Sequence, residues 1–301
     1  MELAPILAYR LDMAIQPRPI GMHLRDWRQR RRLSQLNLAG DAEISARHLS
    51  FLETGRAQPS REMILRLAEQ LDIPIRERNV LLVAAGFAPI FPERRLNDPE
   101  LALANDAITL ALDAHKPYPA FALDRLWRVV ASNAALPELF EGVIEELLEP
   151  PMNALRISLH PRGLAPRIAN LAVWRTHLLY RLRRQIDLTA DAALVDLQRE
   201  LLSYPAPPEV IEHTVDQAVI PLQIHVGGKL LSLFSTTMIF GTPADITLSE
   251  LALEFFFPAN AQTAAIVRDL AASRERALDA APLETLPNGR SDATTELSRL
   301  G

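Results

Sequence analysis

The sequence contains no cysteine among its 301 residues. Disulfide bonds and thiolate metal sites are therefore excluded, and the composition suits the reducing cytoplasm in which we expect the protein. No apolar run approaches the roughly 18 residues of a membrane span. The N-terminal stretch carries Pro5, Pro17 and Pro19 and lacks the sustained apolar core of a signal peptide. We therefore expect a protein without a membrane partner.

Motifs of catalysis are also missing. The 7 histidines show no HExxH or similar metal-ligand spacing, and Gly227-Gly228-Lys229 lacks the rest of a P-loop. There is no G-x-S-x-G, and the adjacent carboxylates Glu145-Glu146 lie in a short acidic stretch typical of a solvated helix. The sequence therefore predicts no enzyme activity, no catalytic residue, no metal site and no required cofactor.

The net charge of −5 conceals a basic module. Residues 18–95 hold 14 Arg against 9 Asp or Glu, a balance of +5, and the remainder holds 18 basic against 28 acidic residues, a balance of −10. A basic module on an acidic protein is typical of a nucleic-acid reader. The length allows two domains, and 49% hydrophobic with 23% charged residues is a globular composition.

The stretch from Leu33 to Ser60 has the punctuation of a helix-turn-helix. Ser34, Ser45 and Ser60 each precede an apolar-periodic run, as helix N-caps do. The residue before each serine is apolar. Counting five positions on from that apolar residue reaches another apolar residue in each case, which is the spacing of a hydrophobic staple. Gly55 marks the end of the second of these helices. The predicted bundle has five helices, over 20–32, 35–42, 46–54, 61–71 and 75–85.

LSQLNLA, IS and HLSFLETGRAQPS resemble the XRE (lambda-repressor-like) family of bacterial DNA-binding domains. The resemblance implies that the helix after Ser45 reads the major groove of DNA. The sequence departs from the family at Glu43, where the turn residue is usually Gly, so a left-handed backbone there is expected to be mildly strained. The resemblance also implies that Arg28 pairs with Glu53, with phosphate contact by Arg28 as the alternative.

Side chains at the leading end of the recognition helix reach base edges in this geometry. Arg47 is the best candidate, because Arg grips guanine O6 and N7 in bidentate fashion. His48 reads a base or a phosphate, or is a plain surface residue. By resemblance Gln35 contacts phosphate or base, while Arg56 and Arg61 suit phosphate. The predicted DNA-binding residues are Gln35, Ser45, Arg47, His48, Ser50, Arg56, Ser60 and Arg61.

A Pro-rich polar segment over 89–103 predicts a linker. Beyond it the texture changes to mixed helix and strand. Two short strands are expected around Asp124-Arg125, followed by a helix that Asn133 caps. Further helices are expected over 100–115, 171–186, 190–203 and 259–277. Strands are expected over 220–226, 230–240 and 251–257, the middle one apolar on both faces as a central strand is.

LWRVVASNAALPELF resembles the opening of a PAS-like sensor domain. SLHPRGLAPRIANLAVWR and VIPLQIHVGGKLLSLFSTTMIFGTPADITLSELALEFFFPA resemble the ligand-binding domain of MmyB-like transcription regulators, from about Ala104 to Arg268. The implied fold is α+β, with an N-terminal all-α, five-helix lambda-repressor-like DNA-binding domain and a C-terminal PAS-like domain of antiparallel sheet and flanking helices. The expected parts are an arm over 1–18, a DNA-binding domain over 19–88, a linker over 89–103, a ligand-binding domain over 104–275 and a disordered tail over 276–301.

A PAS-like sheet with helices across one face encloses an apolar cavity, so large apolar side chains of this half either line a ligand site or form plain core. Arg167, beside the apolar helix over 171–186, either holds a ligand carboxylate or makes a structural ion pair. Such a pocket suits a small apolar ligand, such as a fatty acid. The predicted ligand-binding residues are Trp127, His160, Arg167, Asn170, Trp174, His177, Phe234, Met238 and Phe256.

The sequence thus predicts a sequence-specific, DNA-binding transcriptional regulator whose C-terminal domain senses a small apolar ligand. Double-stranded operator DNA is the expected partner, and two-fold operators favour a homodimer. The alternative is a DNA-binding protein whose C-terminal domain is a dimerisation or protein-interaction module with no ligand.

Overall fold

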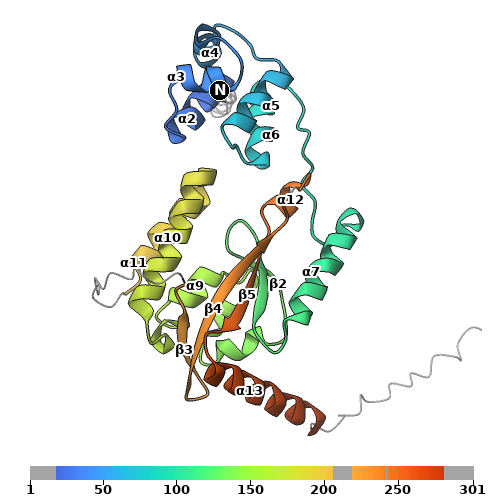
Figure 1. Cartoon of the computed structure of the whole chain (residues 1–301), viewed down its shortest axis with the longest axis vertical. Helices are drawn as coiled ribbons and strands as arrows, with labels where there is room; N and C mark the ends of the chain where they lie inside the picture. The colour runs from blue at the N-terminus through green and yellow to red at the C-terminus, as the bar shows by residue number, and fades with distance from the viewer. Residues whose placement is uncertain (1–17, 206–218, 242, 281–301) are drawn as a thin grey trace, which may run out of the picture.

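The computed structural model describes residues 18–205, 219–241 and 243–280. A helical domain at the N-terminal end is joined by an extended linker to a larger domain built on a sheet (Figure 1). The predicted arm before Arg18 and the predicted tail beyond Ala280 lie outside the described residues.

All five predicted helices of the first domain are present, each ending one or two residues earlier than expected. They are α2 (Ile20–Arg30), α3 (Gln35–Asp41), α4 (Ala46–Glu53), α5 (Arg61–Gln70) and α6 (Ile75–Ala84). The predicted serine caps are confirmed: the hydroxyls of Ser34, Ser45 and Ser60 each accept a hydrogen bond, at 3.0, 3.1 and 3.2 Å, from the backbone N–H three residues on. Each cap satisfies one helix-end donor that has no partner inside the helix.

The same hydrogen-bonded turn ends each of these five helices. The residue after the C-cap is left-handed, and the next N–H bonds the carbonyl of the residue five positions earlier, as in a Schellman motif. The left-handed positions are Arg32, Glu43, Gly55, Asp72 and Gly86. Glu43 has a φ of 55°, so the expected left-handed backbone between α3 and α4 is confirmed and is occupied by a residue with a Cβ.

The helical domain has its own core of fully buried side chains, among them Leu24, Leu38, Leu49 and Leu67. The first helix packs against the recognition helix at very short range. A Cβ on Gly21 would lie 2.4 Å from the carbonyl oxygen of Leu52, so only glycine allows this approach of α2 to α4.

The second domain contains a five-stranded antiparallel sheet of order β2-β1-β5-β4-β3. Its strands are β1 (Ala120–Leu123), β2 (Val129–Ser132), β3 (Leu222–Val226), β4 (Lys229–Ile239) and β5 (Ala252–Pro258). The strands around Asp124-Arg125 and the three strands of the closing block are therefore confirmed. So is the α+β class, with a PAS-like antiparallel sheet and flanking helices.

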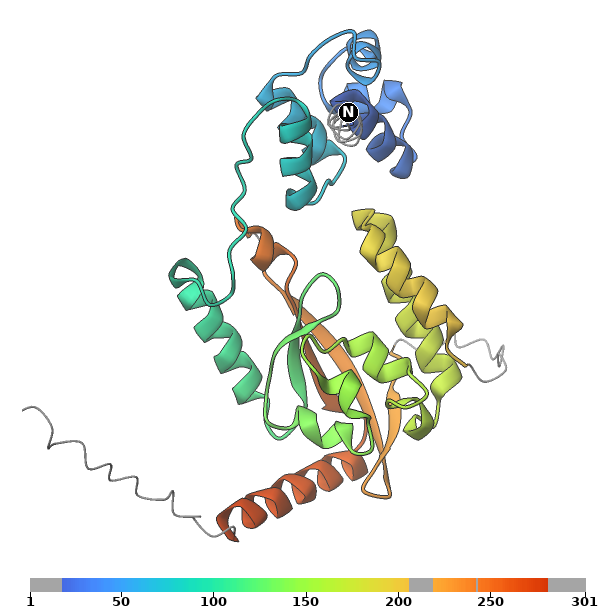
Figure 2. The ribbon, with the colours of Figure 1, turned by 180° about the vertical axis from the view of Figure 1, so that it is seen from behind.

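Helices surround this sheet. They are α7 (Ala102–Ala114), α8 (Glu145–Leu148), α9 (Ala154–Leu159), α10 (Leu171–Thr189), α11 (Ala192–Ser203), α12 (Ile246–Ser249) and α13 (Ala261–Ala280), with 3-10 turns at Pro99–Leu101, Leu136–Phe140 and Ala165–Arg167. α7 runs beside the β1 and β2 side of the sheet and α13 lies beneath it (Figure 1). From behind, α9 crosses one face, with α10 and α11 at its side (Figure 2). The main core lies between this face and these helices.

Two expectations need correction. β4 is not apolar and covered throughout: β3 pairs only with Lys229–Leu233, and Met238 and Ile239 beyond it are 47% and 67% exposed. Asn133 precedes a 3-10 turn rather than an α-helix, and its buried amide oxygen accepts from the N–H groups of Ala120 and Ala135. The helix predicted over 100–115 is confirmed, since a 3-10 turn begins at Pro99 and α7 at Ala102, and it overlaps the end of the predicted linker.

Candidate DNA-binding surface and ligand cavity

The leading end of α4 presents a cationic surface. Arg47 is exposed, while Leu49 and Leu52 of the same helix are buried in the core. The guanidinium of Arg47 lies 5.3 Å from the centroid of the Phe51 ring, and that of Arg56 lies 6.0 Å from it. Phe51 therefore positions two arginines side by side, a contribution that sequence reasoning missed although the four-residue spacing of Arg47 and Phe51 indicates it.

The other predicted DNA-binding residues surround this helix. Ser45 and Ser60 are exposed and cap α4 and α5, which leaves the N-terminal ends of both helices open to an anion. Arg61 is exposed at the start of α5, over the ring of Phe87 at 5.5 Å. His48 and Ser50 are half-buried on α4. DNA contact by these residues stays a prediction.

Arg28 braces α2 against the recognition helix. Its Nε donates to Glu53 Oε1 at 2.6 Å and a terminal nitrogen donates to Oε2 at 2.9 Å. The Glu53 side chain is only 2% exposed. Hydrogen bonding to Glu53 raises the pKa of the Arg28 guanidinium. Of the two readings of Arg28, the ion pair is therefore confirmed, and Gln35, predicted to contact DNA, donates its amide N–H to Glu53 at 2.7 Å.

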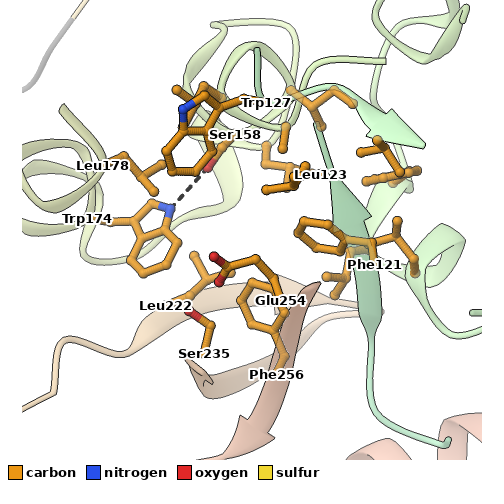
Figure 3. A pocket seen from close by; sticks show the side chains of 18 of the residues that line it. Phe121, Leu123, Trp127, Ser158, Trp174, Leu178, Leu222, Ser235, Glu254 and Phe256 are labelled. Atoms are coloured by element: carbon orange, nitrogen blue, oxygen red, sulfur yellow. Dashed lines mark hydrogen bonds between the residues drawn. The ribbon is translucent and has the colours of Figure 1, made fainter. Parts of the chain in front are cut away.

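A cavity lies between the sheet and the helices that cross it (Figure 3). Trp127, Trp174, Phe121 and Phe256 supply its aromatic walls. The other apolar lining residues are Leu123, Val129, Leu136, Leu139, Phe140, Ala154, Leu155, Ile157, Leu164, Leu178 and Leu222. Lining of this kind favours an apolar occupant.

Four polar side chains also line the cavity. Ser158 accepts the indole N–H of Trp174 at 3.0 Å, and Ser235 lies beside Glu254 (Figure 3). The buried Glu254 carboxylate accepts from Arg181 and, at 2.9 Å, from the hydroxyl of Thr237. The Arg181 guanidinium also lies 5.0 Å from the centroid of the Trp127 ring. The cavity thus offers an apolar interior with one cation and one anion at its wall.

The free space is small. The volume available to the centre of a water-sized sphere is about 70 Å³. On the same measure a single bound water requires about 10–15 Å³. The cavity therefore holds a few waters or a compact group without rearrangement. A longer molecule has to displace lining side chains.

Two family models match the chain. One, for a helix-turn-helix domain, covers residues 19–81. The other, for the MmyB-like transcription regulator ligand binding domain, covers residues 104–270, more than half of the chain. The chain belongs to the MmyB-like transcription regulators.

Solved structures and curated proteins add little to this family assignment. The PAS domain of Bordetella pertussis BvgS is 14% identical and aligns over 57% of this regulator and 96% of its own chain, with a TM-score of 0.25. An RNA-binding light-oxygen-voltage receptor is 13% identical over 92% of this chain and 68% of its own, with a TM-score of 0.24. No curated protein matches the chain.

Three of the predicted ligand-binding residues of this MmyB-like regulator line the cavity: Trp127, Trp174 and Phe256. Phe234 and Met238 lie on the opposite face of the sheet, which corrects their predicted position. Ser235 pairs with Phe256 and lines the cavity, so the adjacent Phe234 points away and stacks on Phe257. Met238 shares the face of Phe234 because strand side chains alternate.

Four further predicted residues lie outside the cavity lining. Arg167 donates to the carbonyls of Leu139 and His225, and burial lowers its pKa. Arg167 thus contacts backbone carbonyls and does not line the cavity, and a ligand contact by Arg167 stays a prediction. Asn170 ties α10 to the start of β3 through Pro221 and Gln223. The remaining two are His160, against Tyr204, and His177, 5.5 Å from the Trp174 ring.

The polar wall of the regulator's cavity was missed by sequence reasoning. Arg181 lies seven residues after Trp174 and three after Leu178, both of which line the cavity. That helical spacing was the available signal. No sequence pattern predicted the position of Glu254 in the cavity wall. It is a carboxylate inside a strand of alternating apolar residues, and its burial is explained by the ion pair with Arg181.

Neither matched family is a family of enzymes. Within the described residues, no three His, Asp or Glu side chains gather in a way that would hold a metal ion. Among the described helices, none combines the length and apolarity needed to cross a membrane.

Proposed function

We propose that this transcription regulator senses a small apolar molecule with an acidic head group, such as a fatty acid, in the cavity of its C-terminal domain. The observation that carries the proposal is an apolar cavity with a single guanidinium, Arg181, at its wall. Glu254 and Thr237 use three of the five N–H donors of a guanidinium, so donors are left for a ligand carboxylate. Arg181 takes the role considered for Arg167.

The charge pair gives a sharp test. Glu254→Gln removes the competing carboxylate and is expected to tighten binding of dodecanoate about tenfold, because a hydrogen bond to a charged group contributes about 1.5–3 kcal/mol. Arg181→Gln in the Glu254→Gln background is expected to weaken it again by at least that factor. Dodecanol, which has the same chain and no charge, serves as the control and should bind both variants equally. Isothermal titration calorimetry of the unmutated protein and both variants measures these affinities.

Equal affinities of dodecanoate for both variants would contradict the role of Arg181. Native mass spectrometry of the purified protein provides the second readout. A co-purifying apolar molecule supports a sensor. A ligand-free protein that binds neither compound supports the alternative, a dimerisation or protein-interaction module, which the small free volume of the cavity favours.

The helix-turn-helix domain is proposed to read a specific operator through the leading end of α4. Arg47→Ala should relax base preference at one position by about 1–3 kcal/mol. Arg61→Ala should weaken binding to all sequences alike and lower the slope of log K against log salt by about 1. The measurements are affinities for DNA selected from a random pool and for scrambled DNA at several salt concentrations. If neither variant alters DNA binding, this surface is not the reader.

The regulator is further proposed to act as a cytoplasmic homodimer, because two-fold operators require two readers. The surface that fits a second copy is the outer face of α7. Leu103 and Leu110 are 86% and 72% exposed there, at the same helical face as the exposed Ala107 and Ala114, whereas Ile108 and Leu112 face the sheet. An apolar stripe of this kind packs on its own copy across a two-fold axis.

A further inference from the structure

The loop between β1 and β2 borders the ligand cavity on one side. On its other side it contacts segments that pack against the DNA-binding domain. It spans residues 124–128 and is held by Asp124, whose Oδ1 accepts from the N–H groups of Leu126 and Arg128 at 2.8 and 2.9 Å. Because those bonds fix the loop as one unit, a displacement at one of its side chains is passed to the others.

On the cavity side the loop carries Trp127. Its ring is 8% exposed and lines the cavity, and its backbone has a φ of 64°, a left-handed conformation that residues with a Cβ rarely adopt. The indole N–H donates to Gln185 at 2.7 Å, and the Gln185 amide donates in turn to the carbonyl of Arg125 at 2.8 Å. Trp127 and Arg125 are therefore joined both through the chain and through Gln185.

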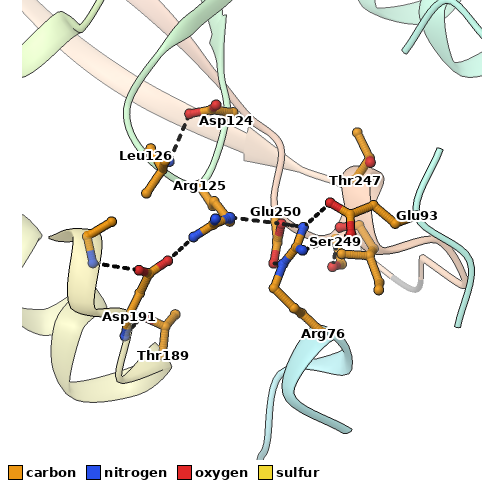
Figure 4. Close-up of polar contacts among 12 residues, drawn as sticks. Arg76, Glu93, Asp124, Arg125, Leu126, Thr189, Asp191, Thr247, Ser249 and Glu250 are labelled. Atoms are coloured by element: carbon orange, nitrogen blue, oxygen red, sulfur yellow. Dashed lines mark hydrogen bonds and ion pairs between the residues drawn. The ribbon is translucent and has the colours of Figure 1, made fainter. Parts of the chain in front are cut away.

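On the other side the loop carries Arg125, which lies between two carboxylates (Figure 4). It forms an ion pair with Asp191 and lies 3.9 Å from an oxygen of Glu250. Both partners belong to segments that contact the helical domain. Asp191 follows Ala190, which packs against the core of that domain. Glu250 accepts from Arg76 of α6 at 2.7 and 2.9 Å.

Arg76 is the residue of the helical domain that binds Glu250. It donates to Glu250 and to Glu93 of the linker, and hydrogen bonding to Glu250 raises its pKa. A second contact comes from Arg31, the C-cap residue of α2, whose guanidinium lies 3.4 and 3.3 Å from the carbonyls of Asp187 and Leu188 in the last turn of α10.

We propose that the loop over residues 124–128 couples occupancy of the cavity to the placement of the DNA-binding domain, through Trp127, Arg125, Glu250 and Arg76. The inference rests on the proposed function, because it requires a ligand in the same cavity. A molecule too long for the free space displaces Trp127, the backbone of Trp127 leaves its left-handed conformation, and Arg125 loses its place between Asp191 and Glu250. A ligand that binds this second state better shifts the population toward it. Both readers of a dimer then change their relative position.

Coupling is reciprocal, so it can be tested from the far end without any ligand. The full chain is labelled with 5-fluorotryptophan, which reports on its 3 tryptophans by ¹⁹F NMR, and the Trp127 resonance is assigned by its loss in Trp127→Phe. Arg76→Gln and Glu250→Gln are expected to shift or broaden that resonance. Glu93→Gln is the matched control, since it removes the other carboxylate from the same arginine and should leave Trp127 unchanged.

An unchanged Trp127 resonance in Arg76→Gln overturns the coupling, as does an equal response to Glu93→Gln. Titration of the unmutated protein with dodecanoate forms the second arm and tests the proposed function separately. Loss of the coupling with a retained dodecanoate response leaves a sensor without this route. A Trp127 response to Arg76→Gln with no dodecanoate response keeps the coupling and removes the proposed ligand.

Discussion

At the scale of single residues, several positions have a backbone conformation or a pKa that is unusual for their residue type. Glu43 and Trp127 are left-handed although each has a Cβ, at φ values of 55° and 64°. Such backbone strain costs about 1–3 kcal/mol and persists only where the surroundings enforce it. For Glu43 the enforcing structure is the turn of the helix-turn-helix, and for Trp127 it is the loop between cavity and linker.

Glu43→Gly is expected to stabilise the protein by about 0.5–1 kcal/mol, because glycine removes the left-handed penalty but gains entropy in the unfolded chain. Glu43→Ala is the control, since it removes the carboxylate and keeps the Cβ. Urea unfolding of both variants measures the difference. A stabilisation that is the same for Ala and Gly would assign the effect to the charge instead of the backbone.

His177 should make the stability of the protein depend on pH. Burial and the neighbouring Arg181 lower the pKa of its imidazole below the usual range. The unfolded chain then binds a proton that the folded chain does not, so the free energy of unfolding rises with pH through that window and falls as pH drops below about 6.5. Denaturation at about pH 7.5 and pH 5.5 should show a smaller loss in His177→Gln than in the unmutated protein. The pKa of His23 is also lowered by burial. Because His23 is present in both proteins, the difference between them reports on His177.

At the scale of elements, the recognition helix depends on a buried ion pair for its position. Arg28 and Glu53 join α2 to α4, at the place where Gly21 allows the two backbones to approach. Removing only one partner of a buried pair leaves the other charge without compensation, which is more damaging than removing both.

Arg28→Met alone is accordingly expected to destabilise the helical domain by about 3–5 kcal/mol. The double variant Arg28→Met with Glu53→Leu should recover most of that loss, since apolar side chains of similar volume replace a buried pair at little cost. Thermal unfolding followed by circular dichroism compares the variants. If the double variant is as unstable as Arg28→Met, the pair contributes through specific hydrogen bonds, including that of Gln35.

At the scale of the whole molecule, function requires two domains to communicate and two copies to associate. Leu103→Ser with Leu110→Ser should convert the proposed dimer to a monomer, because it makes the exposed stripe of α7 polar without touching the core. Light scattering coupled to size-exclusion chromatography measures the mass. Leu202→Ser, at a position 56% exposed on α11, is the control and should remain dimeric. A monomeric unmutated protein, with and without DNA, contradicts the dimer itself.

Local order was predictable from sequence because its causes are local. Ser34, Ser45 and Ser60 cap their helices through bonds of three-residue span, and the strands follow from their local apolar patterns. The same holds for the left-handed turn at Glu43, where the spacing of the motif requires a reversal whichever residue occupies it. Family motifs added the two domains and their order.

Only the tertiary structure decided which polar residues meet. Arg181 and Glu254 are 73 residues apart, and their contact depends on where α10 crosses the sheet. The same is true of Arg167. It precedes a helix that lines the cavity, but its guanidinium donates to backbone carbonyls. Sequence therefore determined the elements, the reader and the class of regulator. The polar wall of the cavity and its link to Arg76 follow from long-range packing, which no local pattern records.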